Sequence, residues 1–296
     1  MNAPAVSTSG LRIGFIGAGR LGQALAGSLA QQGLDVAAVA SGTLAGARAL
    51  AHAIPACAVM SAQTVADRCD LVFITTPDEA IARVTAAVSW RAGVSVVHCS
   101  GVTEVAALDA AARAGAAIGG FHPMQTFGDP RAAMASLPGS TITIESQDES
   151  LRAVLVELAG RLGCRVNRLP PGMRARYHAT AGFTSQFINA LFAQATQVWA
   201  TWGASPEDAL RALMPLARGT LASIDSAGIA AGMPGPVSRG DVASVEKYLR
   251  SLEGMGEEML QFYRVLCGIT IPLAQARGAI DEAAATRIRD LLSSRS

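Results

Sequence analysis

A glycine motif near the N-terminus constrains the fold of this chain more than any other feature. The apolar run of residues 13–16 leads directly into Gly17-Ala18-Gly19-Arg20-Leu21-Gly22, and an Ala- and Leu-rich helical pattern follows at once. A strand, a tight turn and the start of a helix are therefore expected in consecutive residues. In such a unit Gly17 permits the turn, Gly19 leaves room beside the backbone, and Gly22 lets the helix pack closely on the strand.

This arrangement predicts a binding site for the pyrophosphate of a dinucleotide. The free N–H groups and the positive dipole end of the helix face the phosphates in such a site. The alternative is a glycine-rich turn in an ordinary strand–helix unit. Because spacing, strand and helix all agree, the sequence favours dinucleotide binding by residues 17–22.

The end of the second predicted strand, residues 35–39, bears on which dinucleotide binds. A fold that binds NAD places an acidic residue about 20 residues after the glycine motif, where it bonds the ribose 2′-hydroxyl. Here the segment is Ala40-Ser41-Gly42-Thr43, and Arg48 lies one or two helical turns further on. Ser41 and Thr43 supply hydroxyl groups, and no acid repels a 2′-phosphate. The segment therefore favours NADP(H) over NAD(H), although no arginine directly follows the strand.

Up to residue 170, predicted strands alternate with predicted helices. The further strands are expected at residues 57–60, 70–75, 94–97, 116–121, 140–144 and 164–167. This alternation predicts an α/β domain with a doubly wound parallel sheet of the Rossmann type. Ligands of such sheets lie beyond the carboxyl ends of the strands, so we expect Thr75, Thr76 and Pro77 to line the cofactor groove.

From Met173 onward only helical periodicity remains. Helices are expected at residues 174–202, 206–226, 242–252, 256–275 and 280–292. With Leu169-Pro170-Pro171-Gly172 as the boundary, the sequence divides into a flexible tail (1–10), a dinucleotide-binding domain (11–170) and an all-α domain (171–296). The helices of the last domain are so apolar that a partner subunit is expected to cover part of their surface, which predicts a homodimer.

Composition excludes several other classes of partner and location. The formal net charge is +1 and no long basic run occurs, so neither nucleic acid nor an anionic membrane is indicated as a partner. No apolar run reaches transmembrane length, and residues 1–10 do not resemble a signal peptide. The five cysteines are scattered singly, which favours buried thiols in a reducing cytoplasm. Histidines and cysteines lack the spacing of metal ligands, so no metal site is expected.

Several longer motifs together resemble one family. They are the glycine motif, residues 70–78, His98-Cys99-Ser100-Gly101, residues 120–127, Tyr177-His178-Ala179 and Gly235-Pro236-x-x-Arg239-Gly240-Asp241. This set resembles the two-domain proteins described as Rossmann-like plus domain of unknown function 2520 (DUF2520). These belong to a wider group with pyrroline-5-carboxylate reductase, ketopantoate reductase and the β-hydroxyacid dehydrogenases. The resemblance implies NADP(H) binding, a helical C-terminal domain and a homodimer formed by that domain. Gly42 stands where the family often has an arginine.

Two polar clusters follow predicted strands and are candidates for catalysis. His98 and Ser100 would transfer a proton or bind substrate, or Ser100 would instead cap the next helix. His122, held extended by Pro123, is a candidate acid/base group or pocket wall, with a structural histidine as the alternative. Gln125 in the same segment is a candidate substrate ligand.

The helical part adds five further candidates. His178, Ser185 and Asn189 are seven and eleven residues apart, so a single helix would place them on one face, lining a pocket. His178 is then a candidate acid/base, with a buried structural histidine as the alternative. Arg239 and Asp241 would hold a substrate carboxylate and orient a neighbouring group, or would form a salt bridge that fixes the turn.

These features predict an NADP(H)-dependent oxidoreductase. A hydride would pass between the cofactor and a small carbonyl, imine or hydroxy compound in the cleft between the domains. His178 or His98 would handle the proton, and Ser100, His122 and Arg239 would position the substrate. The β-hydroxyacid dehydrogenases use a lysine on the long helix, but the chain's one lysine is Lys247, so their exact chemistry is not expected. The alternative is a sensor or scaffold that binds NADP(H) without turnover.

Overall fold

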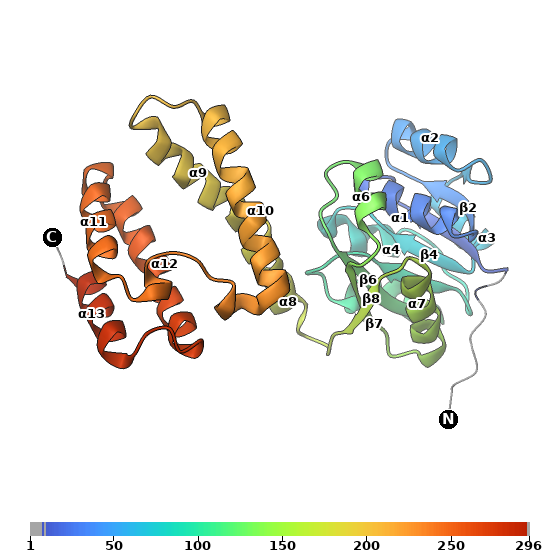
Figure 1. The fold of residues 1–296 in the computed structure, drawn as a ribbon. Helices are drawn as coiled ribbons and strands as arrows, with labels where there is room; N and C mark the ends of the chain where they lie inside the picture. Colours follow the sequence, from blue (N-terminus) through green and yellow to red (C-terminus); the bar gives the residue numbers. More distant parts are fainter. Residues whose placement is uncertain (1–7, 9, 295–296) are drawn as a thin grey trace. The chain divides into compact units, whose positions relative to one another are not determined.

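The computed structural model describes residue 8 and residues 10–294, and the chain forms two compact units. The first comprises residues 1–185 and is built on a sheet, and the second comprises residues 186–296 and is helical (Figure 1). This confirms the predicted fold class. Of the predicted flexible tail, residues 1–7 and 9 lie outside the described residues, whereas Thr8 is buried and its hydroxyl donates to Glu157 at 2.8 Å.

Eight strands form the sheet of the first unit. They are β1 (Arg12–Ile16), β2 (Asp35–Ala40), β3 (Ala58–Val59), β4 (Leu71–Ile74), β5 (Ser95–His98), β6 (Ala117–Met124), β7 (Thr141–Glu145) and β8 (Arg165–Arg168). Their spatial order is β3-β2-β1-β4-β5-β6-β7-β8, so the order reverses between β1 and β4. Ligands of doubly wound sheets bind at such a reversal point.

One neighbouring pair departs from the predicted parallel sheet. β7 runs antiparallel to β6, while the other neighbouring strands are parallel. The reason is that β7 starts beside the end of β6, where the chain left the sheet, since Met124 pairs with Thr141. The segment between them holds a short helix, α6 (Pro130–Ser136), that the sequence did not predict, and no crossover carries the chain back to the other end of the strands.

Helices cover both faces of this sheet. They are α1 (Arg20–Gln31), α2 (Leu44–Ala53), α3 (Ala62–Arg68), the 3₁₀ turn η1 (Asp78–Ala80), α4 (Ile81–Ala86), η2 (Val105–Leu108), α5 (Asp109–Arg113), α6 (Pro130–Ser136), α7 (Glu149–Arg161) and α8 (Arg174–Thr184). The rings of Phe15, Phe73 and Phe121 pack in the core on one face, and Val72, Ile74 and Val96 belong to the core on the other. Burial on both faces explains the nearly continuous apolar runs of the central strands.

The second unit is helical throughout its described residues. It contains α9 (Gln186–Ala200), α10 (Pro206–Ala231), η3 (Val237–Arg239), α11 (Val242–Leu252), η4 (Glu253–Met255), α12 (Glu257–Ala276) and α13 (Glu282–Ser293). Its core comes mainly from α11, α12 and α13. In contrast, α9 has no buried residue and α10 has Ala209 alone. Within the described residues, no helix combines the length and the apolar character needed to cross a membrane.

The predicted single helix over residues 174–202 is wrong. Ser185 has φ −131° and ψ −88°, so α8 ends there and α9 begins at Gln186. The hydroxyls of Thr184 and Ser185 both donate to the carbonyl of Ala181, a local bond that competes with helix continuation. The apolar period runs on across the break, so periodicity alone predicts one continuous helix. His178, Ser185 and Asn189 therefore do not share one helix face.

Candidate functional site

The glycine motif forms a turn against the ends of β2 and β4. Gly17 has φ +119°, a conformation that favours glycine, and its N–H donates to the carbonyl of Ala40 at 2.8 Å. A Cβ at Gly17 would lie 2.5 Å from the carbonyl carbon of Thr75. The Thr75 hydroxyl donates to the Gly17 carbonyl at 2.8 Å. The turn is thus fixed at the point where the strand order reverses.

The start of α1 is open to an anion. Gly19 is the N-cap, so no side chain bonds the free N–H groups, and the first turn holds no acidic residue. A Cβ at Gly19 would meet nothing within 4 Å, whereas one at Gly22 would lie 2.7 Å from the Gly17 carbonyl oxygen. Free amides, a helix dipole and open space beside Gly19 fit a dinucleotide pyrophosphate. Leu21 is partly buried against the core, and Arg20 is exposed.

The other predicted cofactor residues flank this turn. Ser41 follows β2, and its hydroxyl accepts from the N–H of Thr43 at 3.3 Å. Thr43 is in turn the N-cap of α2, on which Arg48 is exposed. After β4, the Thr76 hydroxyl is buried without a protein partner and Pro77 is exposed. The arrangement leaves hydroxyl groups and one cation beside the glycine motif and places no carboxylate at the end of β2.

A second cluster of polar residues lies at the neighbouring strand ends. The register pairs Ile74 with His98, His98 with Gly120, and Gly120 with Glu145. One row of the sheet thus connects the strand beside the glycine turn to both predicted histidine segments. His98 is fully buried, and His122 is 9% exposed.

Arg174, at the start of α8, binds this row of the sheet. Its side chain is fully buried; Nε donates to Glu145 Oε2 at 2.7 Å, and one terminal nitrogen donates to the Ser100 carbonyl at 2.7 Å. A Cβ at Gly120 would lie 1.8 Å from the other terminal nitrogen. The glycine in β6 therefore makes the room that this guanidinium occupies.

His122, Tyr177 and His178 meet beside Gly101. His122 Nδ1 lies 2.9 Å from the Tyr177 hydroxyl, and the rings of His122 and His178 meet edge to face with centroids 5.5 Å apart. A Cβ at Gly101 would lie 2.3 Å from His178 Nδ1 and 2.8 Å from His122 Nε2. His178 is exposed, so its ring joins the buried cluster to solvent.

Burial and positive charge keep two of these histidines neutral. Burial is the largest cause that lowers the pKa of His98, to about 3, and the charges of Arg174 and His122 lower it further. Burial is also the largest cause that lowers the pKa of His122, to about 4, and the charges of His178 and Arg174 lower it further. His98 Nδ1 accepts from the Ser100 N–H at 3.2 Å, so Nε2 carries the proton of the neutral ring.

Other predicted residues bond mainly to their own loops. The Ser100 hydroxyl accepts from the N–H groups of Val102 and Thr103 within its own loop, and the N-cap of the next helical turn is Glu104. Gln125 donates to the Ser136 carbonyl and accepts from the Thr126 N–H, so its amide fixes the loop after β6. Asn189, Arg239 and Asp241 belong to the second unit. There Asp241 caps α11 by accepting from the Ser244 N–H at 3.0 Å, and Arg239 is exposed.

Sequence reasoning missed Arg174, Glu145 and the role of Tyr177. An arginine after a Pro-Pro-Gly turn and a glutamate at a strand end carry no pattern of their own. The one available signal was the pair Gly119-Gly120 inside a predicted strand, because a strand glycine often marks close approach of another group.

Two family models match the chain in succession. Residues 12–101 match the model described as NADP oxidoreductase coenzyme F420-dependent, and residues 140–270 match the model of the domain of unknown function DUF2520. Among curated proteins, none matches the chain.

Solved structures share the fold over nearly the whole chain. A Bacteroides fragilis protein described as a candidate NADP oxidoreductase is 24% identical, with a TM-score of 0.70, covering 90% of this chain and 100% of its own. Reductive aminase from Aspergillus terreus, solved in complex with NADPH, is 18% identical (TM-score 0.63; 93% and 98% covered). A pyrroline-5-carboxylate reductase from Streptococcus pyogenes is 15% identical (TM-score 0.60; 90% and 98% covered).

At these identities the likeness establishes the fold, and the family models locate its two parts. The predicted resemblance is confirmed: residues 12–101 of the sheet match the NADP oxidoreductase model, and the DUF2520 match runs from β7 through most of the helical unit.

Proposed function

We propose that this protein is an NADP(H)-dependent oxidoreductase that acts on a small carbonyl, imine or hydroxy compound. The observation that carries the proposal is the glycine turn at the β1/β4 reversal point, with an open helix N-terminus beside Gly19. The match of residues 12–101 to the NADP oxidoreductase model supports turnover over a sensor or scaffold role.

The backbone of residues 17–22 would hold the pyrophosphate at the start of α1. Ser41 and Thr43 would bond the adenosine ribose and its 2′-phosphate, and Thr75, Thr76 and Pro77 would line the groove beside β4. The absence of an acid at the end of β2 favours NADP(H) over NAD(H). When bound, the cofactor supplies the hydride to a substrate carbon or accepts it from one.

His178 is the proposed proton donor for reduction. It is exposed, whereas His98 is fully buried and neutral, so His178 can reach a substrate atom. As a hydride reaches the carbon of a C=O or C=N bond, His178 would give one proton to the oxygen or nitrogen. The product would be an alcohol or an amine. In the reverse direction the same ring would accept that proton.

His122 and Tyr177 are proposed to orient His178 by packing against it and Gly101. His98 would fix the Ser100 loop through its bond to the Ser100 N–H. Substrate contacts by Gln125, Ser185, Asn189, Arg239 and Asp241, and a reaction site between the domains, stay predictions.

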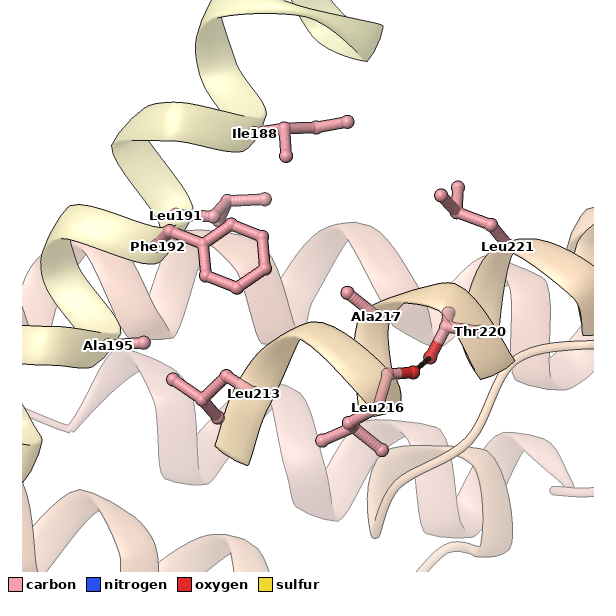
Figure 2. Close-up of a pocket in the computed structure, with 9 residues that line it drawn as sticks. All are labelled: Ile188, Leu191, Phe192, Ala195, Leu213, Leu216, Ala217, Thr220 and Leu221. Carbon is pink, nitrogen blue, oxygen red and sulfur yellow. Dashed lines mark hydrogen bonds between the residues drawn. The ribbon is translucent and has the colours of Figure 1, made fainter. Parts of the chain in front are cut away.

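A homodimer through the helical domain is part of this proposal. Ile188, Leu191 and Phe192 of α9 face Leu213, Leu216 and Leu221 of α10 across an apolar groove (Figure 2). Leu216 is 65% exposed and Leu221 56%, and the 26-residue α10 buries Ala209 alone. Monomers rarely expose so large an apolar surface, and a second copy of the same helices would cover it. A cytoplasmic location is proposed because none of the five cysteines forms a disulfide.

The proposal is tested by a substrate screen with the full-length protein. NADPH oxidation is followed by absorbance with a panel of keto acids, aldehydes, ketones and cyclic imines, and NADP⁺ reduction with hydroxy acids and amines. We expect turnover with one class and a clear preference for NADPH over NADH. NADPH binding without hydride transfer to any class would contradict the oxidoreductase proposal and restore the sensor alternative.

A further inference from the structure

The buried ion pair between Arg174 and Glu145 has no counterpart in the sequence predictions. Arg174 is fully buried and the Glu145 side chain is 9% exposed, and together they span α8 and β7. A buried pair is costly to desolvate, and apolar residues of similar volume often stabilise a fold as well or better. The position of this pair therefore calls for a reason other than stability.

Arg174 contacts three neighbouring strands through one side chain. It bonds Glu145 at the end of β7 and the Ser100 carbonyl after β5, and it lies over Gly120 of β6. No space is left for a side chain at position 120, because it would displace the guanidinium. Nε and one terminal nitrogen of the planar guanidinium bond two partners in different directions, so lysine would not reproduce the arrangement.

The same helix turn carries Tyr177 and His178. Positions 174, 177 and 178 are spaced i, i+3 and i+4, so their side chains lie on one face of α8. When Arg174 is fixed to the strand ends, Tyr177 is held against His122 and His178 against Gly101. The anchor is thus one helical turn from the proposed proton donor.

Arg174 also places a positive charge among the cluster's titratable groups. Those close to it are His98 on β5, Cys99 after β5, His122 on β6, Glu145 on β7 and Tyr177 on α8; His178 lies against His122. Its charge contributes to the lowered pKa values of His98 and His122, after burial in both cases. A neutral His122 can hydrogen-bond the Tyr177 hydroxyl, and it does not compete with His178 for the proton that passes to the substrate.

We propose that Arg174 is a positioning residue. It anchors α8 to the end of β5, the middle of β6 and the end of β7, and it thereby holds Tyr177 against His122 and His178 beside Gly101. This inference rests on the proposed role of His178. It predicts that both the charge and the shape of the guanidinium matter, and that Gly120 and Glu145 are its structural partners.

The test is NMR titration of histidine side chains in the full-length, cofactor-free protein labelled with ¹⁵N-histidine. In the unaltered protein His122 should titrate near pH 4. In the double variant Arg174→Gln/Glu145→Gln, which leaves no unpaired buried charge, the His122 pKa should rise, because the positive charge of Arg174 no longer disfavours protonation of that ring. Arg174→Lys keeps the charge and should leave the His122 pKa low. Arg176→Gln, an exposed arginine on the same helix, is the matched control and should leave it unchanged.

An unchanged His122 pKa in the folded double variant would overturn the inference, and so would an equal rise in the lysine variant. Circular dichroism establishes folding in each case. NADPH titration runs in parallel, because the variants leave the glycine turn intact and should bind NADPH as the unaltered protein does. Failure of all proteins to bind NADPH would refute the proposed function while leaving the histidine titration valid.

Discussion

His122 Nδ1 lies 2.9 Å from the hydroxyl oxygen of Tyr177, and the two rings meet edge to face with centroids 5.6 Å apart. This contact joins β6 to α8 within one compact unit. It gives His122 a hydrogen-bond partner in a site where an added proton would face Arg174 and His178. Two consequences follow, one for stability and one for catalysis.

Stability should fall as pH falls through the acid range. Histidine normally ionises near 6.5, and the folded pKa values of His122 and His98 are lowered to about 4 and about 3. Between pH 6.5 and these folded-state pKa values, the unfolded chain binds more protons than the folded protein does. The stabilisation present above pH 6.5 is therefore lost as the pH falls. Each histidine contributes a slope of up to about 1.4 kcal/mol per pH unit.

Urea denaturation at a series of pH values measures this slope. His122→Asn should make the loss of unfolding free energy with acidification shallower, most visibly from about pH 6.5 to 5, where carboxylates contribute least. His52→Asn, at an exposed position on α2, should leave the slope as it was. Equal slopes in all three proteins would be incompatible with a neutral, buried His122.

Replacing His178 should remove turnover without affecting cofactor binding. His178→Gln keeps a polar side chain of similar size but cannot transfer a proton, and general acid catalysis is worth about 10²- to 10⁴-fold. We expect kcat with the best substrate of the screen to fall by about 10²-fold or more. The NADPH dissociation constant should be unchanged. His52→Gln serves as the control, and full activity of His178→Gln would assign the proton to another group.

Local patterns predicted the sheet well because the apolar residues of each strand and helix follow the burial of that element. The glycine motif, the apolar runs of β1, β4 and β5 and the switch to helical period after Met173 each depend on neighbours close in sequence. The antiparallel β7 depends on where a 16-residue segment re-enters the sheet, which periodicity does not encode. The break at Ser185 depends on hydroxyl bonds to one carbonyl within an unbroken apolar pattern.

The sequence predicts the histidines of the candidate site but not the residues that fix their positions. His98, His122 and His178 stood out as polar residues in apolar surroundings at strand ends and on a helix. Arg174 and Glu145 pair across 29 positions, and an ion pair of that separation leaves no trace in composition or spacing. Gly101 and Gly120 matter through the side chains that approach them, which only the tertiary structure reveals.

Gly17→Ala should destabilise the first unit. Its φ of +119° is strained for any other residue, and the new Cβ would lie 2.5 Å from the Thr75 backbone. We expect the free energy of unfolding to fall by about 1–3 kcal/mol. Urea denaturation followed by circular dichroism measures the change, with Gly160→Ala in α7, where a Cβ meets nothing within 4 Å, as the control. An unaltered midpoint for Gly17→Ala would refute the strained turn.

A charge in the apolar groove of the helical unit should dissociate the proposed dimer. Leu216→Glu places a carboxylate among the apolar residues of α9 and α10 that Figure 2 shows. Sedimentation analysis should find the unaltered protein as a dimer and the variant mainly as a monomer. Arg287→Glu changes the charge of an exposed position on α13 and should stay dimeric. A monomeric unaltered protein would contradict the proposed homodimer.

The central claim is that the open turn beside Gly19 binds NADP(H), and a fluorescence titration with NADPH tests it most directly. A Cβ at Gly19 meets no protein atom within 4 Å, so Gly19→Ala should fold normally while its methyl group occupies the space that a pyrophosphate needs. We predict saturable binding by the unaltered protein and by Gly160→Ala, and a dissociation constant at least about tenfold higher, or ~1.4 kcal/mol weaker binding, for Gly19→Ala. Absence of NADPH binding by the unaltered protein, or equal binding by Gly19→Ala, would contradict the account.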